Sequence, residues 1–365
     1  MRGFGVLLAT GVALAAAPSA FGAAPTLRAD HAVARYNDSV RFRGTLATPD
    51  PQQVVLLRDG AAVASVLATG GAFSFDLRLR TPGTFVARAA LGDSAAVGVR
   101  LSPRLRTRII GRRVVGACVA LRGRMLPARA GRLLYGRKPV PVAADGRFRV
   151  KLATDRGPRV ASRLRLVPAP GYVTARRRVR VRLAQPLLRM GSHGPAVRLL
   201  KERLWRQHYA LPSLDAGFGY KTYEAVVAFQ KVHRLSRTGQ VGRDVWRVLW
   251  RTSVPRARRG GDYLEVDKSR QVLLEVRKGR VVNVIHVSTG ATGNTPLGTW
   301  RVYSEIAGWS WVLWQPMYFL RGFAIHGYPL VPPWPASHGC VRVPMWLATS
   351  LRERWGYGSV VRVFS

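Results

Sequence analysis

Hydrophobic and polar residues alternate in short runs over most of the chain, with Gly, Pro and Asp between the runs. The alternation is typical of antiparallel β-strands, and it predicts two β-sandwiches over residues 25–100 and 101–185. It stops in residues 186–251, where apolar residues recur every three or four positions, as they do in helices. A basic linker with Pro and Gly, residues 252–261, precedes residues 262–365, in which the period of two returns. The predicted fold is therefore multidomain and mainly β.

An internal repeat supports the two sandwiches. Residues 40–46 are echoed by residues 119–125, and residues 71–77 are echoed by residues 146–152. The two offsets, 79 and 75 residues, are similar, so we expect two copies of one unit. We predict no chemistry in either copy.

The helical region predicts a three-helix unit. Pro195 stands where the first turn of a helix tolerates proline, and apolar residues follow it at helical spacing. Two further helices are expected around residues 225–232 and 245–249, with a turn at residues 215–219 after the first helix. In the C-terminal region we expect strands instead, at residues 263–266, 272–276 and 281–287.

The charge of the chain narrows the choice of partner. The 59 Lys and Arg residues against 18 Asp and Glu give a net charge of +41 at pH 7. This charge favours a polyanionic partner, either nucleic acid or an anionic cell envelope, and a solvated basic surface is the third interpretation.

The N-terminus, residues 1–24, decides between the first two partners. It combines Arg2, an apolar run and small residues, which together are typical of a secretory signal peptide; a retained membrane anchor is the alternative. We therefore expect an exported, wall-associated monomer that binds anionic wall polymers, with possible membrane proximity and no nucleic acid.

The candidate chemistry lies near the C-terminus, in Ile325-His326-Gly327 and in Ser337-His338-Gly339-Cys340-Val341-Arg342. A thiol with an ordinary pKa near ~8.5 is mostly protonated at neutral pH, so a cysteine nucleophile needs a neighbouring base. His326 can fold back beside Cys340 across the intervening loop, whereas His338 is too close in sequence to approach the sulfur freely. We predict Cys340 as the nucleophile and His326 as the proton acceptor and donor.

The residues beside Cys340 suggest further roles. Gly339 allows a sharp turn, so that N–H groups around Cys340 can converge on a developing oxyanion. Arg342 could grip a substrate carboxylate, or it could form a structural ion pair. Cys118 is expected to be an ordinary buried thiol. No His, Asp and Glu set has ligand spacing, so we expect neither a metal nor a cofactor.

These motifs make residues 262–364 resemble the L,D-transpeptidase catalytic domain, whose signature is His-Gly followed, after a loop, by Ser-His-Gly-Cys. Residues 288–290 and 295–299 match the Ser-Thr-Gly and Thr-Pro-x-Gly stretches of that family, and residues 317–319 lead into the His-Gly strand as expected. The resemblance implies surroundings that stabilise the oxyanion, orient the base and bind substrate. The residues that would stabilise the oxyanion or orient the base are Ser337, His338, Gly339 and Gly327. Those that would bind substrate are Arg342 and Tyr318.

The rest of the chain resembles modules of wall proteins. Residues 186–251 are similar to the peptidoglycan-binding domain of many wall enzymes, on motifs such as Gly217-Phe218-Gly219 and Phe229-Gln230. The two sandwiches resemble bacterial immunoglobulin-like domains, which are usually spacers or adhesion units.

The resemblance implies a reaction on peptidoglycan that serves wall biogenesis and cell shape. Cys340 would attack the carbonyl of the third stem residue and expel D-alanine, and an amine on another stem would resolve the acyl-enzyme into a 3→3 cross-link. Two alternatives stay open. Water could resolve the acyl-enzyme, as in an L,D-carboxypeptidase, or the chain could be a wall-binding or adhesion protein with an inert catalytic domain. The segment between His326 and Cys340 is rich in proline and should be stiff.

Overall fold

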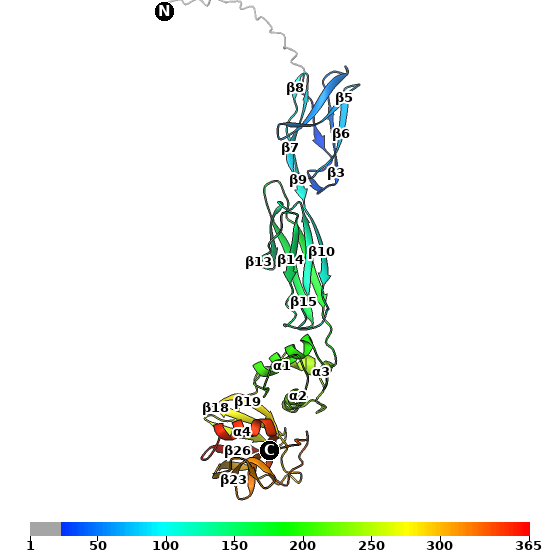
Figure 1. Ribbon diagram of the computed structural model, residues 1–365. Helices are drawn as coiled ribbons and strands as arrows, with labels where there is room; N and C mark the ends of the chain where they lie inside the picture. Colours follow the sequence, from blue (N-terminus) through cyan, green and yellow to red (C-terminus); the bar gives the residue numbers. More distant parts are fainter. Residues whose placement is uncertain (1–22) are drawn as a thin grey trace, which may run out of the picture. The chain divides into compact units, whose positions relative to one another are not determined.

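The computed structural model describes residues 23–365 (Figure 1). These residues form two compact units. The first unit extends to Arg108 and includes Arg122–Arg149 and Arg163–Arg177, and the second comprises Ile109–Leu121, Val150–Ser162 and Arg178–Ser365. Nearly all of the expected signal peptide, residues 1–24, lies outside the described residues. Within residues 23–365, none of the helices has the length and apolar character needed to cross a membrane.

The first β-domain has two sheets that enclose one core. One sheet has the order β1-β3-β6 and the other β2-β9-β7-β4-β5, with β8 paired to β7. Strand β3 alternates exposed and buried residues, so that Val40 and Phe42 point inward, and the ring of Phe42 lies 4.5 Å from that of Phe85 on β7. The strands are β1 (Arg28–Ala29), β2 (Val33–Arg35), β3 (Ser39–Thr45), β4 (Gln52–Arg58), β5 (Ala61–Ala68), β6 (Ala72–Arg78), β7 (Gly83–Ala89), β8 (Gly92–Asp93) and β9 (Val97–Ser102).

The second β-domain also has two sheets, with the orders β10-β11-β14 and β13-β12-β15-β16. Its strands are β10 (Arg104–Ile110), β11 (Ala120–Leu126), β12 (Gly131–Tyr135), β13 (Lys138–Pro139), β14 (Arg147–Lys151), β15 (Arg159–Pro168) and β16 (Arg176–Arg182). Cys118 is exposed and free, so the expectation of a buried thiol was wrong: this residue lies two positions before β11 begins.

Two glycines occupy equivalent positions in the two β-domains. A Cβ atom on Gly44 of β3 would lie 2.1 Å from Cζ of Phe73, and a Cβ atom on Gly123 of β11 would lie 2.2 Å from Cζ of Phe148. In each domain the glycine is on the middle strand of the three-stranded sheet, and the phenylalanine is on the neighbouring edge strand. The repeat in the sequence therefore corresponds to one local packing arrangement used twice.

The second unit contains the three expected helices, α1 (Pro195–Arg206), α2 (Tyr220–Val232) and α3 (Arg243–Leu249), which confirms the three-helix prediction. Helix α1 begins with proline and buries Leu200 and Leu204 on one face. The chain after α1 then pairs with the C-terminal domain. The N–H of Ala210 donates to the carbonyl of Val284 at 3.1 Å, and the N–H of Val284 donates to the carbonyl of His208 at 2.8 Å.

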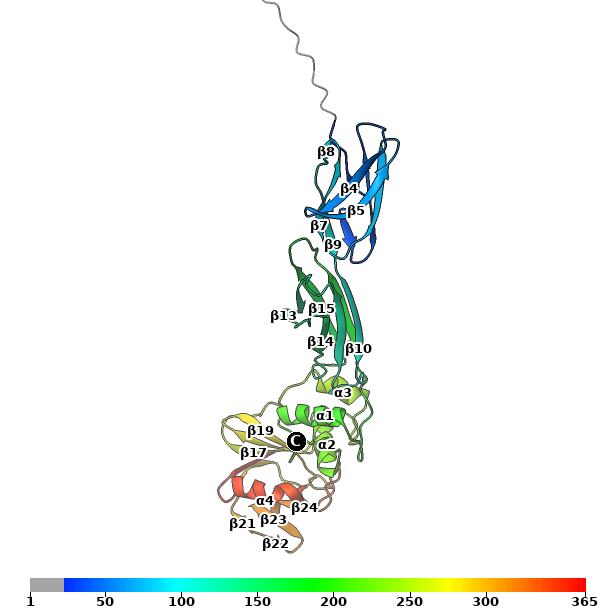
Figure 2. The same ribbon diagram turned by 45° about the horizontal axis from the view of Figure 1, so that its top comes forward.

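The C-terminal domain combines two sheets with one helix. The sheets have the orders β19-β18-β17-β26-β20 and β21-β23-β24-β25, with β22 paired to β23. Helix α4 (Met345–Arg354) packs against β23 and β24 (Figure 2), and one hydrophobic core joins both sheets and this helix. The strands are β17 (Tyr263–Asp267), β18 (Val272–Arg277), β19 (Arg280–His286), β20 (Gly298–Arg301), β21 (Ser304–Glu305), β22 (Trp309–Ser310), β23 (Leu313–Leu320), β24 (Phe323–Tyr328), β25 (Val341–Pro344) and β26 (Val360–Phe364).

Candidate active site

The site is built on two neighbouring parallel strands, β24 and β25. Ile325 pairs with Val341 and His326 pairs with Arg342. Ile325 and Val341 are fully buried in the core, and successive side chains on a strand point to opposite faces. His326 and Arg342 therefore lie on the other face of the sheet. Cys340 directly precedes Val341, the first residue of β25, so the turn that carries the thiol lies beside the strand of His326.

The sulfur of Cys340 contacts the backbone of β24 and of the turn before it. The N–H of Ala324 donates to Sγ at 3.4 Å, and the thiol donates to the carbonyl of Gly322 at 3.6 Å. Burial raises the pKa of the Cys340 thiol, and the Ala324 N–H and the charge of Arg342 oppose that rise. The resting sulfur is therefore a protonated thiol at neutral pH.

The imidazole of His326 is 2% exposed, and burial lowers its pKa to about 4. Its Nδ1 lies 2.9 Å from the carbonyl oxygen of Gly327. A carbonyl only accepts, so Nδ1 carries the proton and Nε2 keeps a lone pair. Within residues 23–365, no hydrogen bond joins this ring to the sulfur of Cys340. The neutral ring can accept a proton.

The Ser337–Cys340 turn is stabilised by the hydroxyl group of Ser337 and by the backbone conformation of Gly339. Ser337 Oγ donates to the carbonyl of Cys340 at 2.6 Å and accepts the N–H of Gly339 at 3.0 Å. Gly339 has φ near +132°, and a Cβ atom there would lie 2.5 Å from a ring carbon of Phe323. The N–H of Gly339 is thus occupied, whereas the N–H of Cys340 has no hydrogen-bond partner among residues 23–365.

A second loop supports this turn from outside. Thr295 Oγ1 donates to the carbonyl of Gly339 at 2.6 Å and accepts the N–H of Gly290 at 2.9 Å. Asn294 Nδ2 donates to the carbonyl of His338 at 2.8 Å. The side chain of His338 is exposed, so the part of this residue that the fold uses is its carbonyl.

Arg342 faces an aromatic ring. Its guanidinium carbon lies 4.1 Å from the ring centroid of Tyr328, a residue whose ring also meets His326 edge-on at 5.9 Å. No carboxylate of the described residues pairs with Arg342, so the alternative of a structural ion pair is not realised in residues 23–365. Its positive charge adds to the lowering of the pKa of His326 by burial and opposes the rise in the pKa of Cys340.

Comparisons with known proteins identify the families that parts of this chain resemble. Residues 261–363 match the family model of the L,D-transpeptidase catalytic domain, and residues 193–249 match that of the peptidoglycan-binding domain. An L,D-transpeptidase from Xylanimonas cellulosilytica is 35% identical over 50% of this chain and 98% of its own, with a TM-score of 0.48. The chain belongs to the L,D-transpeptidase family. An L,D-transpeptidase from Stackebrandtia nassauensis is 24% identical over 49% of this chain and 95% of its own, with a TM-score of 0.31. No curated protein matches this chain.

Two further residues of the L,D-transpeptidase motif have structural explanations. Tyr318 of β23 pairs with Ala324 of β24, so it shares the face that carries His326, and its hydroxyl lies 3.2 Å from Ser310 Oγ. A Cβ atom on Gly327 would lie 2.7 Å from the Cβ of Ala348 on α4. Gly327 is thus required for the helix to pack, and it supplies the carbonyl that fixes the tautomer of His326.

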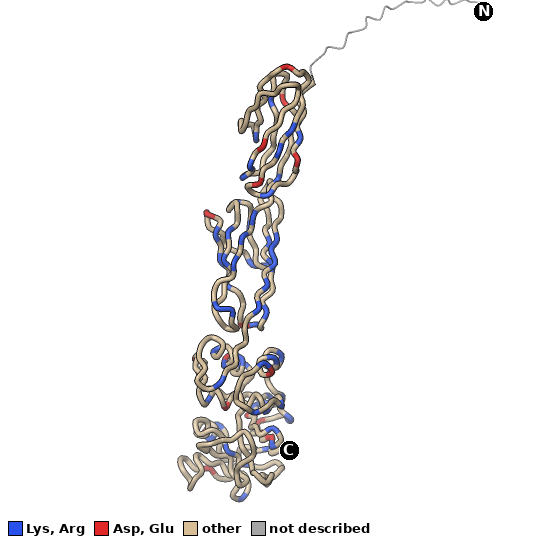
Figure 3. The backbone as a smooth tube through the Cα atoms, turned by 90° about the vertical axis from the view of Figure 1, so that its right-hand side faces the viewer, with Lys and Arg blue, Asp and Glu red and all other residues tan. Residues whose placement is uncertain are grey.

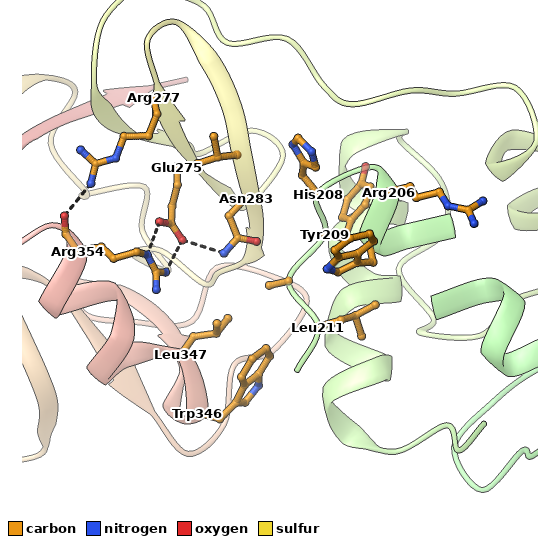
Figure 4. A pocket seen from close by; sticks show the side chains of 13 residues that line it. Arg206, His208, Tyr209, Leu211, Glu275, Arg277, Asn283, Trp346, Leu347 and Arg354 are labelled. Atoms are coloured by element: carbon orange, nitrogen blue, oxygen red, sulfur yellow. Dashed lines mark hydrogen bonds and ion pairs between the residues drawn. The ribbon is translucent and has the colours of Figure 1, made fainter. Parts of the chain in front are cut away.

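A separate cavity of about 720 Å³ lies between the segment after α1 and the L,D-transpeptidase domain (Figure 4). Its carboxylate, Glu275, is occupied: Arg354 donates to both oxygens at 2.7 and 3.0 Å, and Asn283 and Trp355 donate at 2.8 and 2.7 Å. This carboxylate therefore has a structural explanation. Among residues 23–365, no group of His, Cys, Asp and Glu is arranged to hold a metal ion.

The contacts by which side chains support the site are not marked by any motif in the sequence. Asn294 and Thr295 lie within or beside a stretch that resembles the family, but their contacts to the cysteine turn depend on a loop 44 residues away in the sequence. His286, buried on β19, was not singled out because nothing in its local sequence marks it.

Proposed function

We propose that this chain is an exported, cysteine-dependent L,D-transpeptidase that forms 3→3 cross-links in peptidoglycan. The observation that carries the proposal is the contact between the Cys340 sulfur and the backbone of β24, the strand of His326, together with a neutral imidazole whose Nε2 is available. Since the thiol is protonated at rest, the sulfur needs a base during attack, and His326 is the group placed to serve.

The first half-reaction transfers the donor stem to sulfur. Nε2 of His326 takes the proton of the Cys340 thiol while Sγ attacks the carbonyl carbon of the third stem residue. The N–H of Cys340, which has no hydrogen-bond partner within residues 23–365, is the backbone donor available to the resulting oxyanion. The C–N bond to the terminal D-alanine then breaks, and the imidazolium returns the proton to the departing amine. A thioester on Cys340 remains.

The second half-reaction releases the product. The side-chain amine of a third residue on another stem attacks the thioester carbonyl, and His326 accepts the proton that this amine loses. The C–S bond breaks, an amide joins the two stems, and the proton returns to sulfur. Arg342, whose guanidinium has no carboxylate partner in the described residues, is proposed to bind a stem carboxylate, and Tyr318 on the same face to contact the stem.

Attachment to the wall is the second part of the proposal. Residues 101–185 hold 23 Lys and Arg against Asp145 and Asp155, and the basic residues follow the strands of this domain (Figure 3). With a peptidoglycan-binding domain next in sequence, this charge supports attachment to anionic wall polymers. We expect retention on purified walls to fall as salt rises from low to high ionic strength.

The test of the reaction is product analysis by mass spectrometry. Stem tetrapeptides incubated with the protein should give cross-linked dimers and free D-alanine, and Cys340→Ala should give neither while still binding walls. Tripeptides without dimers would replace the proposal with an L,D-carboxypeptidase. No product from the unmodified chain would favour a wall-binding protein.

A further inference from the structure

A lysine of the helical domain reaches into the L,D-transpeptidase domain. Lys231 lies on α2 and is 1% exposed. Its Nζ donates to the carbonyls of Gln271 at 2.9 Å and Val287 at 2.7 Å, and it lies 2.6 Å from Nδ1 of His286. All three acceptors belong to the L,D-transpeptidase domain, so each N–H of an ammonium group at this position has a partner there.

The two hydrogen bonds of the His286 ring determine which of its nitrogens carries the proton. This ring is 1% exposed, and its Nε2 lies 2.7 Å from the carbonyl oxygen of Val331. Because that carbonyl can only accept, Nε2 carries the proton, and Nδ1 accepts from Lys231. Lys231 therefore fixes the tautomer with which His286 holds Val331.

Val331 belongs to residues 328–335, the segment that connects the strand of His326 to the turn of Cys340. The helical domain holds this segment at a second point. Arg237, which follows α2, donates from Nη1 to the carbonyl of Pro333 at 2.9 Å and from Nη2 to the carbonyl of Ser269 at 3.3 Å. Lys231, acting through His286, and Arg237 thus anchor the loop between His326 and Cys340 from the helical domain.

The anchored segment touches the site at both ends. It begins with Tyr328, whose ring contacts Arg342 and His326. Near its other end, the carbonyl of Trp334 accepts from Ser288 Oγ at 2.7 Å, and the backbone of Ser288 pairs with that of Arg342. A shift of residues 328–335 would therefore move the groups that face the imidazole and the thiol.

We propose that Lys231, acting through His286, and Arg237 are positioning residues for the cysteine site, so that the peptidoglycan-binding domain is part of the catalytic geometry as well as an attachment module. The inference rests on the proposed function in that Cys340 is taken as the reacting group. It predicts that loosening residues 328–335 impairs the site even when the protein folds and binds walls normally.

The chain offers a matched control at the same domain junction. Trp346 Nε1 on α4 donates to Glu224 Oε2 on α2 at 2.7 Å, and this contact also joins the helical domain to the L,D-transpeptidase domain. Trp346 makes no hydrogen bond to residues 328–335 in the described part of the chain. Trp346→Phe therefore weakens the junction without releasing the loop.

The experiment uses the full chain carrying Cys118→Ser, so that thiol alkylation reports on Cys340 alone. Lys231→Met, His286→Phe and Arg237→Gln remove the anchors, whereas His286→Gln and Arg237→Lys keep polar groups in their place. For each variant, the rate of Cys340 alkylation by iodoacetamide is measured as a function of pH, and the release of D-alanine from tetrapeptide gives kcat and KM. Melting temperature and circular dichroism establish folding.

We expect the three anchor-removing variants to lose about tenfold or more in kcat, a modest displacement of reacting groups being enough for such a loss. The midpoint of their alkylation profile should move to higher pH, because Arg342 would no longer be held where it opposes the raised pKa of the thiol. His286→Gln and Arg237→Lys should recover part of the kcat and part of the shift in the alkylation midpoint. The kcat of Trp346→Phe should stay within about twofold of that of the parent protein.

Folded Arg237→Gln and His286→Phe proteins that match Trp346→Phe in kcat and in the alkylation profile would overturn the proposal, even if Lys231→Met failed to fold. The two proposals fail differently. A shifted alkylation profile in a protein that releases no D-alanine would retain the positioning role and reject the proposed reaction.

Discussion

His326 lies on β24, Cys340 directly precedes β25, the parallel strand that pairs with β24, and within residues 23–365 no hydrogen bond joins the two side chains. The ring is fixed by the carbonyl of Gly327, and the sulfur by the backbone at residues 322 and 324. Burial lowers the pKa of the ring and raises that of the thiol, so the resting site holds two neutral groups. We infer that the proton moves as the sulfur attacks.

The pH dependence of acylation follows from the pKa of His326. Burial lowers that pKa to about 4, so the ring stays neutral, and able to accept a proton, down to mildly acidic pH. We expect kcat/KM for acylation to be nearly constant between pH 7 and about 5, and to fall about tenfold per pH unit below about 4. The measurement is the rate of thioester formation against pH. A loss centred near 6.5, the value of an ordinary imidazole, would contradict the burial of this base.

Gly339→Ala should disable the site. Its φ of +132° is rarely adopted by other residues, and the added Cβ would lie 2.5 Å from the ring of Phe323. We expect a loss of about 1–3 kcal/mol in the free energy of unfolding and at least ~100-fold in kcat. Gly293→Ala is the matched control, because Gly293 also has positive φ, +72°, but has open space around it. Urea unfolding measures the loss of stability, and D-alanine release measures the loss of kcat. An equal loss of kcat in Gly339→Ala and Gly293→Ala would show that backbone strain alone explains the loss.

Arg342→Gln should act on both the thiol and the substrate. The Arg342 charge opposes the rise in the pKa of Cys340, so its removal should move the alkylation midpoint of Cys118→Ser protein to higher pH. KM for tetrapeptide should also rise, by roughly tenfold or more, if the guanidinium grips a carboxylate. Arg342→Lys should restore the midpoint better than KM, because lysine keeps the charge and loses the planar fork. An unchanged midpoint in Arg342→Gln would argue against this electrostatic role.

Glu224→Gln should stabilise the protein at alkaline pH. Burial raises the pKa of Glu224 to about 7, above the ordinary 4.5. Between these values the folded state binds more protons than the unfolded state, so stability falls as pH rises through this window. Glutamine removes that loss, and we expect a gain of up to about 3 kcal/mol in unfolding free energy at pH 8, with little change at pH 4. Urea titrations at both pH values test this; an equal gain at both would show that the charge of Glu224 is not responsible.

The parts of the fold that could be predicted are those that a local pattern specifies. The strands β17 to β19 and the helices α1 to α3 could be predicted from the spacing of hydrophobic residues and from turn residues within a short window. Helix α4 was missed, although Leu347, Ala348 and Leu351 are buried at helical spacing, because it directly follows β25, whose last residue, Pro344, is also the N-cap of the helix.

The supporting contacts of the site could not be predicted, because they depend on register between distant segments. The motif identified Cys340 and His326, but the capture of the Gly339 N–H by Ser337 depends on the path of the turn. Lys231 and His286 are 55 residues apart, and only the docking of α2 on β19 brings them together. The exposure of Cys118 likewise depends on where β11 begins.

The most direct test of the account is the rate at which a stem tetrapeptide acylates Cys340, followed by rapid quenching and intact-protein mass spectrometry. Cys118→Ser protein and its His326→Ala variant are compared near pH 7. We predict a thioester adduct that maps to Cys340, formed at least ~100-fold more slowly without the imidazole. An adduct on another residue, or an equal rate in a folded His326→Ala protein, would contradict the account.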